Sequence, residues 1–312
     1  MAKDDSSDLL TFAVIGLLAY GVLKSGKLND ILARLQGGGA PYVPPPAPTI
    51  PGIPTPPTTT PAPTTPGTPP VTTVPDVPVS GDFSFAAAGD FRPGPSAFVS
   101  ALSKTNIPLI LGLGDYAYSQ SPDAWMKVYA PLKSKTKPCK GNHDGGSTWL
   151  GLWGIQSWTY GFKMGNCYFI CCDTEGSNPH VQSECVKAMA DPGVKFIIAY
   201  YHRPYVTCSC SHGPDGKAQA INNILEKYTA KCKLVLTGHN HNYQRFKPIN
   251  GITYCVVGTA DKDSYAVSGG GANSVIQNTS ANGYLHVTPT ANSLVCKFVP
   301  ISGSFTDSFT IT

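Results

Sequence analysis

The chain has 312 residues, of which 32 are glycine and 29 are proline, and only 13% of its residues are charged. This length suits one large catalytic domain with appended segments, and the composition favours a β-rich extracellular protein over a cytosolic helical one. The net charge of +4 is too small to indicate nucleic-acid binding, although it is compatible with an anionic substrate.

The N-terminal segment, residues 1–39, predicts an apolar helix that becomes amphipathic. Residues 9–23 contain no charge, and at about 1.5 Å per residue they reach roughly 22 Å, short of a hydrocarbon core of about 30 Å. Residues 28–35 continue with apolar side chains at helical spacing, and three glycines at 37–39 end the helix. Acidic residues before the apolar run and the lack of a cleavage pattern disfavour a signal peptide. We therefore expect residues 9–36 to anchor the protein in a membrane or in a self-assembled particle.

Residues 40–80 are rich in proline and threonine and contain no lysine or arginine. Such a segment cannot bury enough apolar surface to fold, so it predicts a semi-rigid disordered stalk that could carry O-glycans. The stalk, a sequon at Asn278, and the cysteines favour an extracellular, cell-surface location. The positive charges of Lys24, Lys27 and Arg34 would instead place the C-terminal side in the cytoplasm.

The ten cysteines lie between Cys139 and Cys296. Their even number predicts disulfides in an oxidising compartment, at least two pairs of them, with Cys208 and Cys210 as one candidate pair. Cys171 and Cys172 are adjacent, and on alternating faces of a strand they could not both join one core. The alternative is a set of reduced, buried cysteines that pack as small apolar residues.

Residues 81–312 predict the folded domain, an α/β arrangement in which apolar strands alternate with helices. Helices are expected near residues 95–104, 181–189 and 217–228, and residues 251–312 are expected to complete a second sheet. Several strands end in a residue type that binds metal, and the carboxyl ends of strands gather at one edge of an open sheet. The residues expected there are Asp90, Asp115, Asn142, His143, His202, His239 and His241. Carboxylate, amide oxygen and imidazole together suit Fe, Mn or Zn, and Asp115 is the natural bridge between two cations.

The order of these motifs resembles the calcineurin-like metallophosphoesterases, and within them the purple acid phosphatases. The motifs are GD at 89–90, GDYAY at 114–118, GNHD at 141–144, YYHRP at 200–204 and GHNHNYQR at 238–245. Tyr118, where most other members carry an acid, and the extension of the last motif to Arg245 favour the purple subgroup. The resemblance implies a metallophosphoesterase-type β-sandwich flanked by helices. One departure is Arg92, where purple acid phosphatases usually have glycine.

The resemblance also implies the role of each residue. One metal would be held by Asp90, Asp115, Tyr118 and His241, and the other by Asp115, Asn142, His202 and His239. The pair would be Fe(III) with Fe, Zn or Mn(II). His143 would contact the substrate or protonate the leaving oxygen. Arg92 and Arg203 are candidates for contact with the substrate phosphate, whereas Asp173 is interpreted as structural, and Arg245 is as readily a loop anchor as a phosphate contact.

Three functions follow as alternatives. The first is a purple-acid-phosphatase-like phosphomonoesterase, displayed at a surface, in which metal-bound hydroxide attacks the ester. The second is a phosphodiesterase or nucleotidase with the same metals. The third is a structural surface or particle protein that displays a phosphatase-like domain. The chain has no Gly-x-Ser-x-Gly elbow and no P-loop, so a side-chain nucleophile of those types is not expected.

Overall fold

The computed structural model describes residues 74–78, 81–92, 94, 96–208 and 210–312, all within the compact unit Pro66–Thr312. The expected N-terminal helix and most of the Pro/Thr stalk lie outside these residues, so the anchor and the extracellular location stay predictions. Deletion of residues 1–40 would test the anchor, and protease treatment of intact cells would test the extracellular location. Among the described residues, no helix has both the length and the apolar character needed to cross a membrane.

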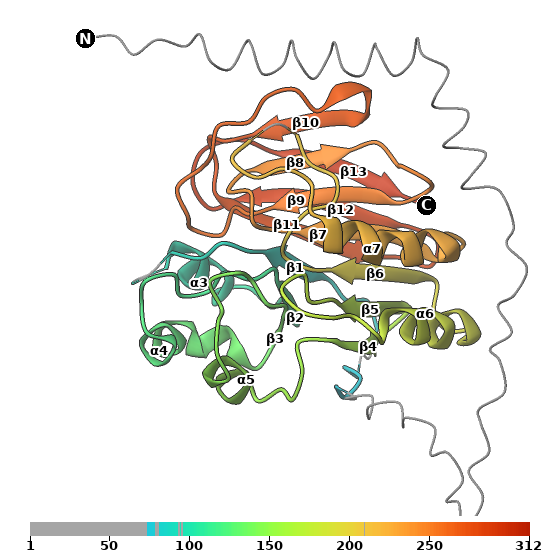
Figure 1. Cartoon of the computed structure of the whole chain (residues 1–312), viewed down its shortest axis with the longest axis horizontal. Helices are drawn as coiled ribbons and strands as arrows, with labels where there is room; N and C mark the ends of the chain where they lie inside the picture. Colours follow the sequence, from blue (N-terminus) through green and yellow to red (C-terminus); the bar gives the residue numbers. More distant parts are fainter. Residues whose placement is uncertain (1–73, 79–80, 93, 95, 209) are drawn as a thin grey trace, which may run out of the picture. The chain divides into compact units, whose positions relative to one another are not determined.

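Two β-sheets form the centre of the domain, as the sequence predicts (Figure 1). One sheet has the strand order β13 (Asp307–Ile311), β12 (Leu294–Pro300), β11 (Gly283–Pro289), β1 (Phe85–Ala88), β2 (Leu109–Gly112) and β3 (Thr136–Pro138). The other has the order β10 (Ser274–Asn278), β8 (Tyr243–Phe246), β9 (Thr253–Val257), β7 (Cys232–Thr237), β6 (Phe196–Tyr200), β5 (Cys167–Cys171) and β4 (Tyr160–Met164). Strands β1 to β3 run parallel, and so do β5, β6, β7 and β9, which aligns their carboxyl ends.

The C-terminal strands divide between the sheets. Strands β9 and β10 join the sheet of β5 to β7, while β11 to β13 extend the sheet of β1 by antiparallel pairing. The expectation that residues 251–312 complete one second sheet is therefore only partly right. Strand β11 pairs with β1, which lies almost 200 residues earlier in the chain, and local sequence patterns carry no information about such a partner.

Five helices flank the sheets in the described part of the chain. Helices α6 (Val181–Ala190) and α7 (Gly216–Leu225) pack beside each other, and α3 (Ala97–Leu102), α4 (Pro122–Lys133) and α5 (Thr148–Trp153) form a second group (Figure 1). Three of these helices were expected, and α4 and α5 were not. Helix α4 nevertheless has a recognisable N-terminal signal in the sequence. The Ser121 side chain accepts a hydrogen bond from the backbone N–H of Ala124, and Pro122 begins the first turn.

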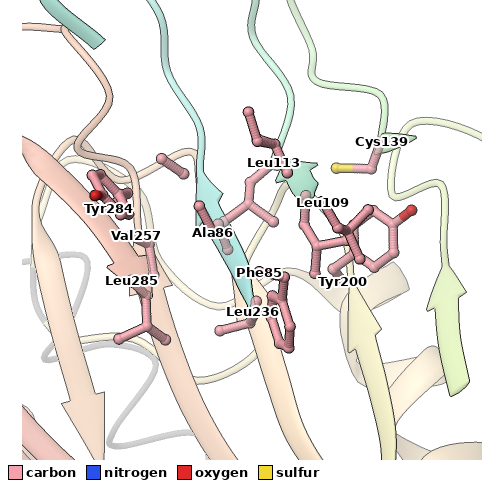
Figure 2. Close-up of a cluster of buried hydrophobic side chains, with 14 of the residues drawn as sticks. Phe85, Ala86, Leu109, Leu113, Cys139, Tyr200, Leu236, Val257, Tyr284 and Leu285 are labelled. Atoms are coloured by element: carbon pink, nitrogen blue, oxygen red, sulfur yellow. The ribbon is translucent and has the colours of Figure 1, made fainter. Parts of the chain in front are cut away.

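A core of large side chains joins the two sheets. Phe85 of β1 meets Phe169 of β5 edge to face, with ring centroids 5.1 Å apart. Figure 2 shows Phe85, Tyr200 and Leu236 close together, although they come from strands of different sheets. A second core lies between the β5–β7 sheet and helices α6 and α7. The β5–β7 sheet is thus buried on both faces, which explains why its strands are nearly continuous runs of apolar residues.

All ten cysteines are free thiols in the structure, which gives no support to the predicted disulfides. Nine of them are buried. As expected, Cys171 and Cys172 do not share one core, but each is buried in a core of its own: Cys171 packs in the core between the sheets and Cys172 in the core beneath the helices, so the pair does not favour disulfides. Burial also raises the pKa of both thiols, so in this structure they behave as small apolar side chains.

Candidate metal centre

The carboxyl ends of five parallel strands bring the predicted ligands together. Strand β1 leads to Asp90, β2 to Asp115 and Tyr118, and β3 to Asn142 and His143. From the other sheet, β6 leads to His202, and β7 leads to His239 and His241. The backbone N–H of His239 donates to Asp90 Oδ2 at 2.8 Å, which connects the end of β7 directly to the end of β1. The site therefore spans both sheets at one edge.

The backbone is strained at this edge. Among the described residues other than glycine, five have positive φ angles, and four of these are Asp90, Asp115, Tyr118 and His239, with φ between 46° and 68°. A left-handed backbone costs a residue with a Cβ atom about 1–2 kcal/mol. Such strain persists where surrounding contacts enforce it, and it is common at functional sites. Here it turns four side chains away from their strands and toward one another.

One group of ligands surrounds the Tyr118 hydroxyl. The hydroxyl lies 3.1 Å from Asp90 Oδ1 and 2.8 Å from His241 Nε2. Asp90 Oδ1 and His241 Nε2 are themselves 3.4 Å apart. Burial, together with the charges of Asp90 and Asp115, raises the pKa of the Tyr118 phenol far above its usual value. A phenol among carboxylates ionises only if a cation compensates its charge.

The other group surrounds His202 Nε2. This nitrogen lies 3.1 Å from Asn142 Oδ1, 3.3 Å from Asp115 Oδ2 and 3.2 Å from His239 Nδ1. Candidate donor atoms of Asp115, His202 and His239 fall within 4.8 Å of one another, as one bound cation requires. The second group contains all four residues of one ligand set implied by the sequence, and the first contains three of the four residues of the other. Asp115, which the sequence implies in both sets, lies beside His202, and its charge contributes to the raised pKa of Tyr118.

Backbone carbonyls set the orientation of two histidines. His202 Nδ1 lies 2.8 Å from the Leu113 carbonyl oxygen, and His241 Nδ1 lies 3.1 Å from the Asp263 carbonyl oxygen. Each carbonyl accepts a hydrogen bond, so Nδ1 carries the proton and Nε2 points into the site. This arrangement is typical of metal-binding histidines, whose second nitrogen is held by an outer hydrogen bond.

Asp115 and His202 shift each other's pKa, and this affects metal binding. Burial by itself would raise the pKa of Asp115, but His202 and the His143 backbone N–H outweigh it and hold that pKa well below the usual range. Burial would lower the pKa of His202, but Asp115 outweighs it and raises the pKa to about 10. Without metal, His202 therefore carries a second proton in the neutral pH range. Because a cation must displace that proton, we expect metal affinity to rise with pH across the neutral range.

Asp144 holds the two ligand loops together. Its buried carboxylate accepts three backbone N–H bonds, from Asp115 at 2.8 Å, Tyr116 at 2.9 Å and Gly141 at 2.8 Å. Gly141 lies so close to Asp115 that a Cβ atom at this position would come within 2.1 Å of Asp115 Oδ1. Asp144 thus fixes the loop after β2 against the loop after β3.

Replacing Asp144 with alanine is expected to destabilise the domain by about 3 kcal/mol or more, because three buried N–H donors would lose their acceptor. Asp144→Asn keeps one acceptor oxygen and is expected to lose less. Urea unfolding of both variants measures the difference. Equal stability of Asp144→Ala and the wild type would show that this carboxylate does not anchor the loops.

His143 lies at the rim of the site and is not a member of either ligand group. Its backbone N–H donates to Asp115 Oδ1 at 2.8 Å, while its side-chain Nε2 lies 4.0 Å from Asp115 Oδ2. The side chain is 48% exposed, and its ring packs against Tyr118 with centroids 4.5 Å apart. This position suits a group that meets the substrate.

The three arginines of the motifs differ in their surroundings. Arg92 is 57% exposed and pairs with Asp263 at 3.2 Å. Arg245 forms two hydrogen bonds with Asp307 of β13, at 2.7 and 2.9 Å, so it anchors β8 to the other sheet. Arg203 is bound to Glu175, and its Nη1 lies 3.2 Å from His239 Nε2. Asp173 accepts hydrogen bonds within its own turn, which agrees with the structural interpretation.

Sequence reasoning missed His212 and Tyr265. The His212 ring stacks on His239 with centroids 4.0 Å apart, and Tyr265 stacks on His241 at 3.9 Å. A shallow cavity of about 420 Å³ opens beside them, lined by Cys210, Ser211, Ala266, Val267 and Ser268. His212 follows His202 by ten residues in an irregular loop, and only its residue type could have singled it out.

Comparisons with known proteins agree with this architecture. A sequence model of the calcineurin-like phosphoesterase family matches residues 84–243. A purple acid phosphatase from yellow lupin (Lupinus luteus) seeds is similar in structure, with a TM-score of 0.61 and 16% identity over 75% of this chain and 54% of that chain. This chain therefore spans about half the length of the lupin enzyme.

Two further structures resemble the domain. GAP50, described as the anchor in the inner membrane complex of Plasmodium, has a TM-score of 0.60 and 17% identity over 75% of this chain and 90% of its own. A dimetal phosphatase from Danio rerio has a TM-score of 0.54 and 13% identity over 74% of this chain and 98% of its own. No curated protein sequence matches. The match of the family model, over half of the sequence and across all five strand ends of the site, shows that the chain belongs to the calcineurin-like phosphoesterase family.

Proposed function

We propose that the chain is a phosphoesterase with two metal ions, similar to purple acid phosphatases, that hydrolyses phosphate monoesters. The convergence of seven candidate ligands from five strand ends into two adjacent groups carries this proposal. Membership of the family supports hydrolysis of a phosphoric ester as the reaction.

The donor atoms fit two cations. Asp90 Oδ1, the Tyr118 hydroxyl and His241 Nε2 face one point, and Asp115 Oδ2, Asn142 Oδ1, His202 Nε2 and His239 Nδ1 face another. Oxygen and imidazole ligands of this mixture suit Fe, Zn or Mn. When bound, two such ions lower the pKa of water and stabilise the charge that develops on phosphate oxygens.

Residues of the protein orient the metal ligands and supply a proton to the leaving group. Asp144 and the carbonyls of Leu113 and Asp263 hold the ligands in place before any substrate arrives. His143, half-exposed beside Tyr118, is the residue that we assign to the leaving oxygen, which needs a proton when its bond to phosphorus breaks.

A diesterase and a structural role are the alternatives. A phosphodiesterase would use the same metal ligands as a phosphomonoesterase. An assay of the metal-loaded protein with 4-nitrophenyl phosphate and bis(4-nitrophenyl) phosphate distinguishes these two activities. The structural role draws support from the likeness to GAP50, which is described as an anchor. Metal-loaded protein that cleaves neither ester would overturn the enzymatic proposal and favour the structural one.

If Tyr118 binds ferric iron, the protein is expected to absorb visible light through charge transfer from tyrosinate to iron. Tyr118→Phe removes only the hydroxyl that contacts Asp90 and His241, so it is expected to bleach that band and to leave the fold intact. Absorption spectra with metal analysis and circular dichroism make the test. Tyr284→Phe is a matched control, because that tyrosine lies on β11 outside the site. Colourless protein that contains iron would exclude Tyr118 as a ligand.

A further inference from the structure

The loop after β9 is fixed to the backbone of two residues of the first ligand group. The backbone N–H of Lys262 donates to the Asp90 carbonyl oxygen at 3.1 Å, and the backbone N–H of Tyr265 donates to the His241 carbonyl oxygen at 2.9 Å. Residues 266–268 of the same loop line the shallow cavity beside the site. The loop therefore forms a fixed wall of the candidate metal centre, and the side chains that it carries have defined places there.

Lys262 brings an ammonium group to the ring of Tyr118. Its Nζ lies 4.4 Å from the ring centroid, in a cation–π contact, and the residue is half-buried. The hydroxyl of Tyr118 points instead to Asp90 and His241. The ammonium is thus held over the ring, next to the donor atoms that face the metal position, and it is not a solvated surface charge.

The carboxylates on either side of Lys262 in the sequence have other partners. Asp261 accepts hydrogen bonds from the Ser96 hydroxyl and from a backbone N–H at the start of α3, and Asp263 pairs with Arg92 at 3.2 Å. Among the residues that the structure describes, none forms an ion pair with Lys262. A half-buried ammonium without a counter-ion has lost part of its hydration, so an anionic ligand that reaches it gains a charge-assisted contact.

His143 relates Lys262 to the leaving group. The ring of His143, the residue that we assign to the leaving oxygen, packs against the same Tyr118 ring with centroids 4.5 Å apart. Lys262 and His143 therefore lie close enough together for one small leaving group to meet both. A carboxylate has the single negative charge that one ammonium neutralises. We propose that Lys262 is a specificity-determining residue that binds a carboxylate on the leaving group, and that phosphate esters of hydroxy acids are preferred substrates.

This inference rests on the proposed function, because a leaving group exists only if the chain cleaves a phosphate ester. Lys262 contacts no reacting atom, so it strengthens the binding of substrate and transition state alike. With phosphoglycolate and ethyl phosphate as substrates, Lys262→Met is therefore expected to raise KM for phosphoglycolate about 10-fold and to leave kcat near its wild-type value. Both constants for ethyl phosphate should stay unchanged. A lysine that only supports the fold would instead alter kcat for both esters.

Calorimetric titration of the metal-loaded full-length chain measures the binding without turnover. Three phosphonates of similar length differ at one end: 3-phosphonopropionate carries a carboxylate, propylphosphonate a methyl group and 3-aminopropylphosphonate an ammonium group. The variants are Lys262→Met, Lys262→Gln, Lys262→Arg and Lys262→Glu, with metal analysis of each. Lys104→Met is the control for the loss of one charge, because Lys104 is exposed and precedes the amino end of β2, away from the site.

We expect the wild type to bind 3-phosphonopropionate about 10-fold more tightly than propylphosphonate, the scale of one charge-assisted hydrogen bond. Lys262→Met and Lys262→Gln should remove this preference and change propylphosphonate binding by less than about threefold. Lys262→Arg keeps the charge and should retain most of the preference. Lys262→Glu should reverse it in favour of 3-aminopropylphosphonate, because the sign of the charge beside the leaving group is then inverted.

Equal binding of the three phosphonates by the wild type would overturn the inference, and so would a carboxylate preference that persists in Lys262→Met. If Lys262→Met loses metal, Lys262→Gln decides in the same way, and loss of metal from both would make Lys262 a support of Tyr118 and overturn the inference. A chain that cleaves no phosphate ester but prefers 3-phosphonopropionate through Lys262 would refute the proposed function and retain the carboxylate contact. A chain that cleaves 4-nitrophenyl phosphate and binds the three phosphonates equally would do the opposite.

Discussion

Replacing Asp115 with alanine is expected to abolish phosphatase activity and to remove both metals. Asp115 is 2% exposed, its Oδ2 lies 3.3 Å from His202 Nε2, and its Oδ1 accepts the backbone N–H of His143 at 2.8 Å. The variant loses the carboxylate that we propose to be shared by the two metal ions, and with it a negative charge that would balance them. We expect the rate with 4-nitrophenyl phosphate to fall to the level of the uncatalysed reaction.

Elemental analysis after dialysis measures the metals, and Asp82→Ala provides a matched control, because Asp82 is exposed and precedes β1. The variant is also expected to lower the pKa of His202, since Asp115 is the largest of the charges that raise it. An Asp115→Ala protein that cleaves the ester at the wild-type rate would show that the reaction takes place elsewhere.

His143→Ala is expected to keep both metals and to lower kcat by about 10²–10⁴, the usual scale for a positioned proton donor. The side chain is 48% exposed and its Nε2 is 4.0 Å from Asp115 Oδ2, so its removal leaves the ligand groups in contact. The backbone N–H that binds Asp115 Oδ1 remains in the variant. Stability is therefore expected to change little.

The leaving group distinguishes a proton donor from a structural residue. Esters with strongly acidic leaving groups need little protonation, so the rate loss in His143→Ala should be smaller for 4-nitrophenyl phosphate than for an alkyl phosphate. His286→Ala on β11 is the control for loss of one imidazole outside the site. An identical loss for both esters would exclude proton donation by His143, and loss of metal would place it among the ligands.

Much of the fold could be predicted because its strands are apolar runs with clear ends. Helices α3, α6 and α7 were expected within a few residues of their observed bounds. Helix α4 was missed although Ser121 and Pro122 begin it, because Pro131 inside its last turn breaks the helical pattern. Pro131 lacks the backbone N–H that would bond to the carbonyl of Lys127, so the helix gives up one internal hydrogen bond there.

The sequence by itself determined which residue types stand at the end of each strand, and in which order. Gly89, Gly114 and Gly238 precede Asp90, Asp115 and His239, and the lack of a Cβ atom at these glycines lets the strand ends approach one another closely. Tertiary structure decided how these ends meet: Asp144 joins two loops, His212 stacks on His239, and Glu175 orients Arg203 from 28 residues away. It also gave Cys171 and Cys172 separate cores. Local patterns report only on neighbours along the chain, whereas these contacts depend on which strands lie side by side, and burial in the complete domain selects that arrangement.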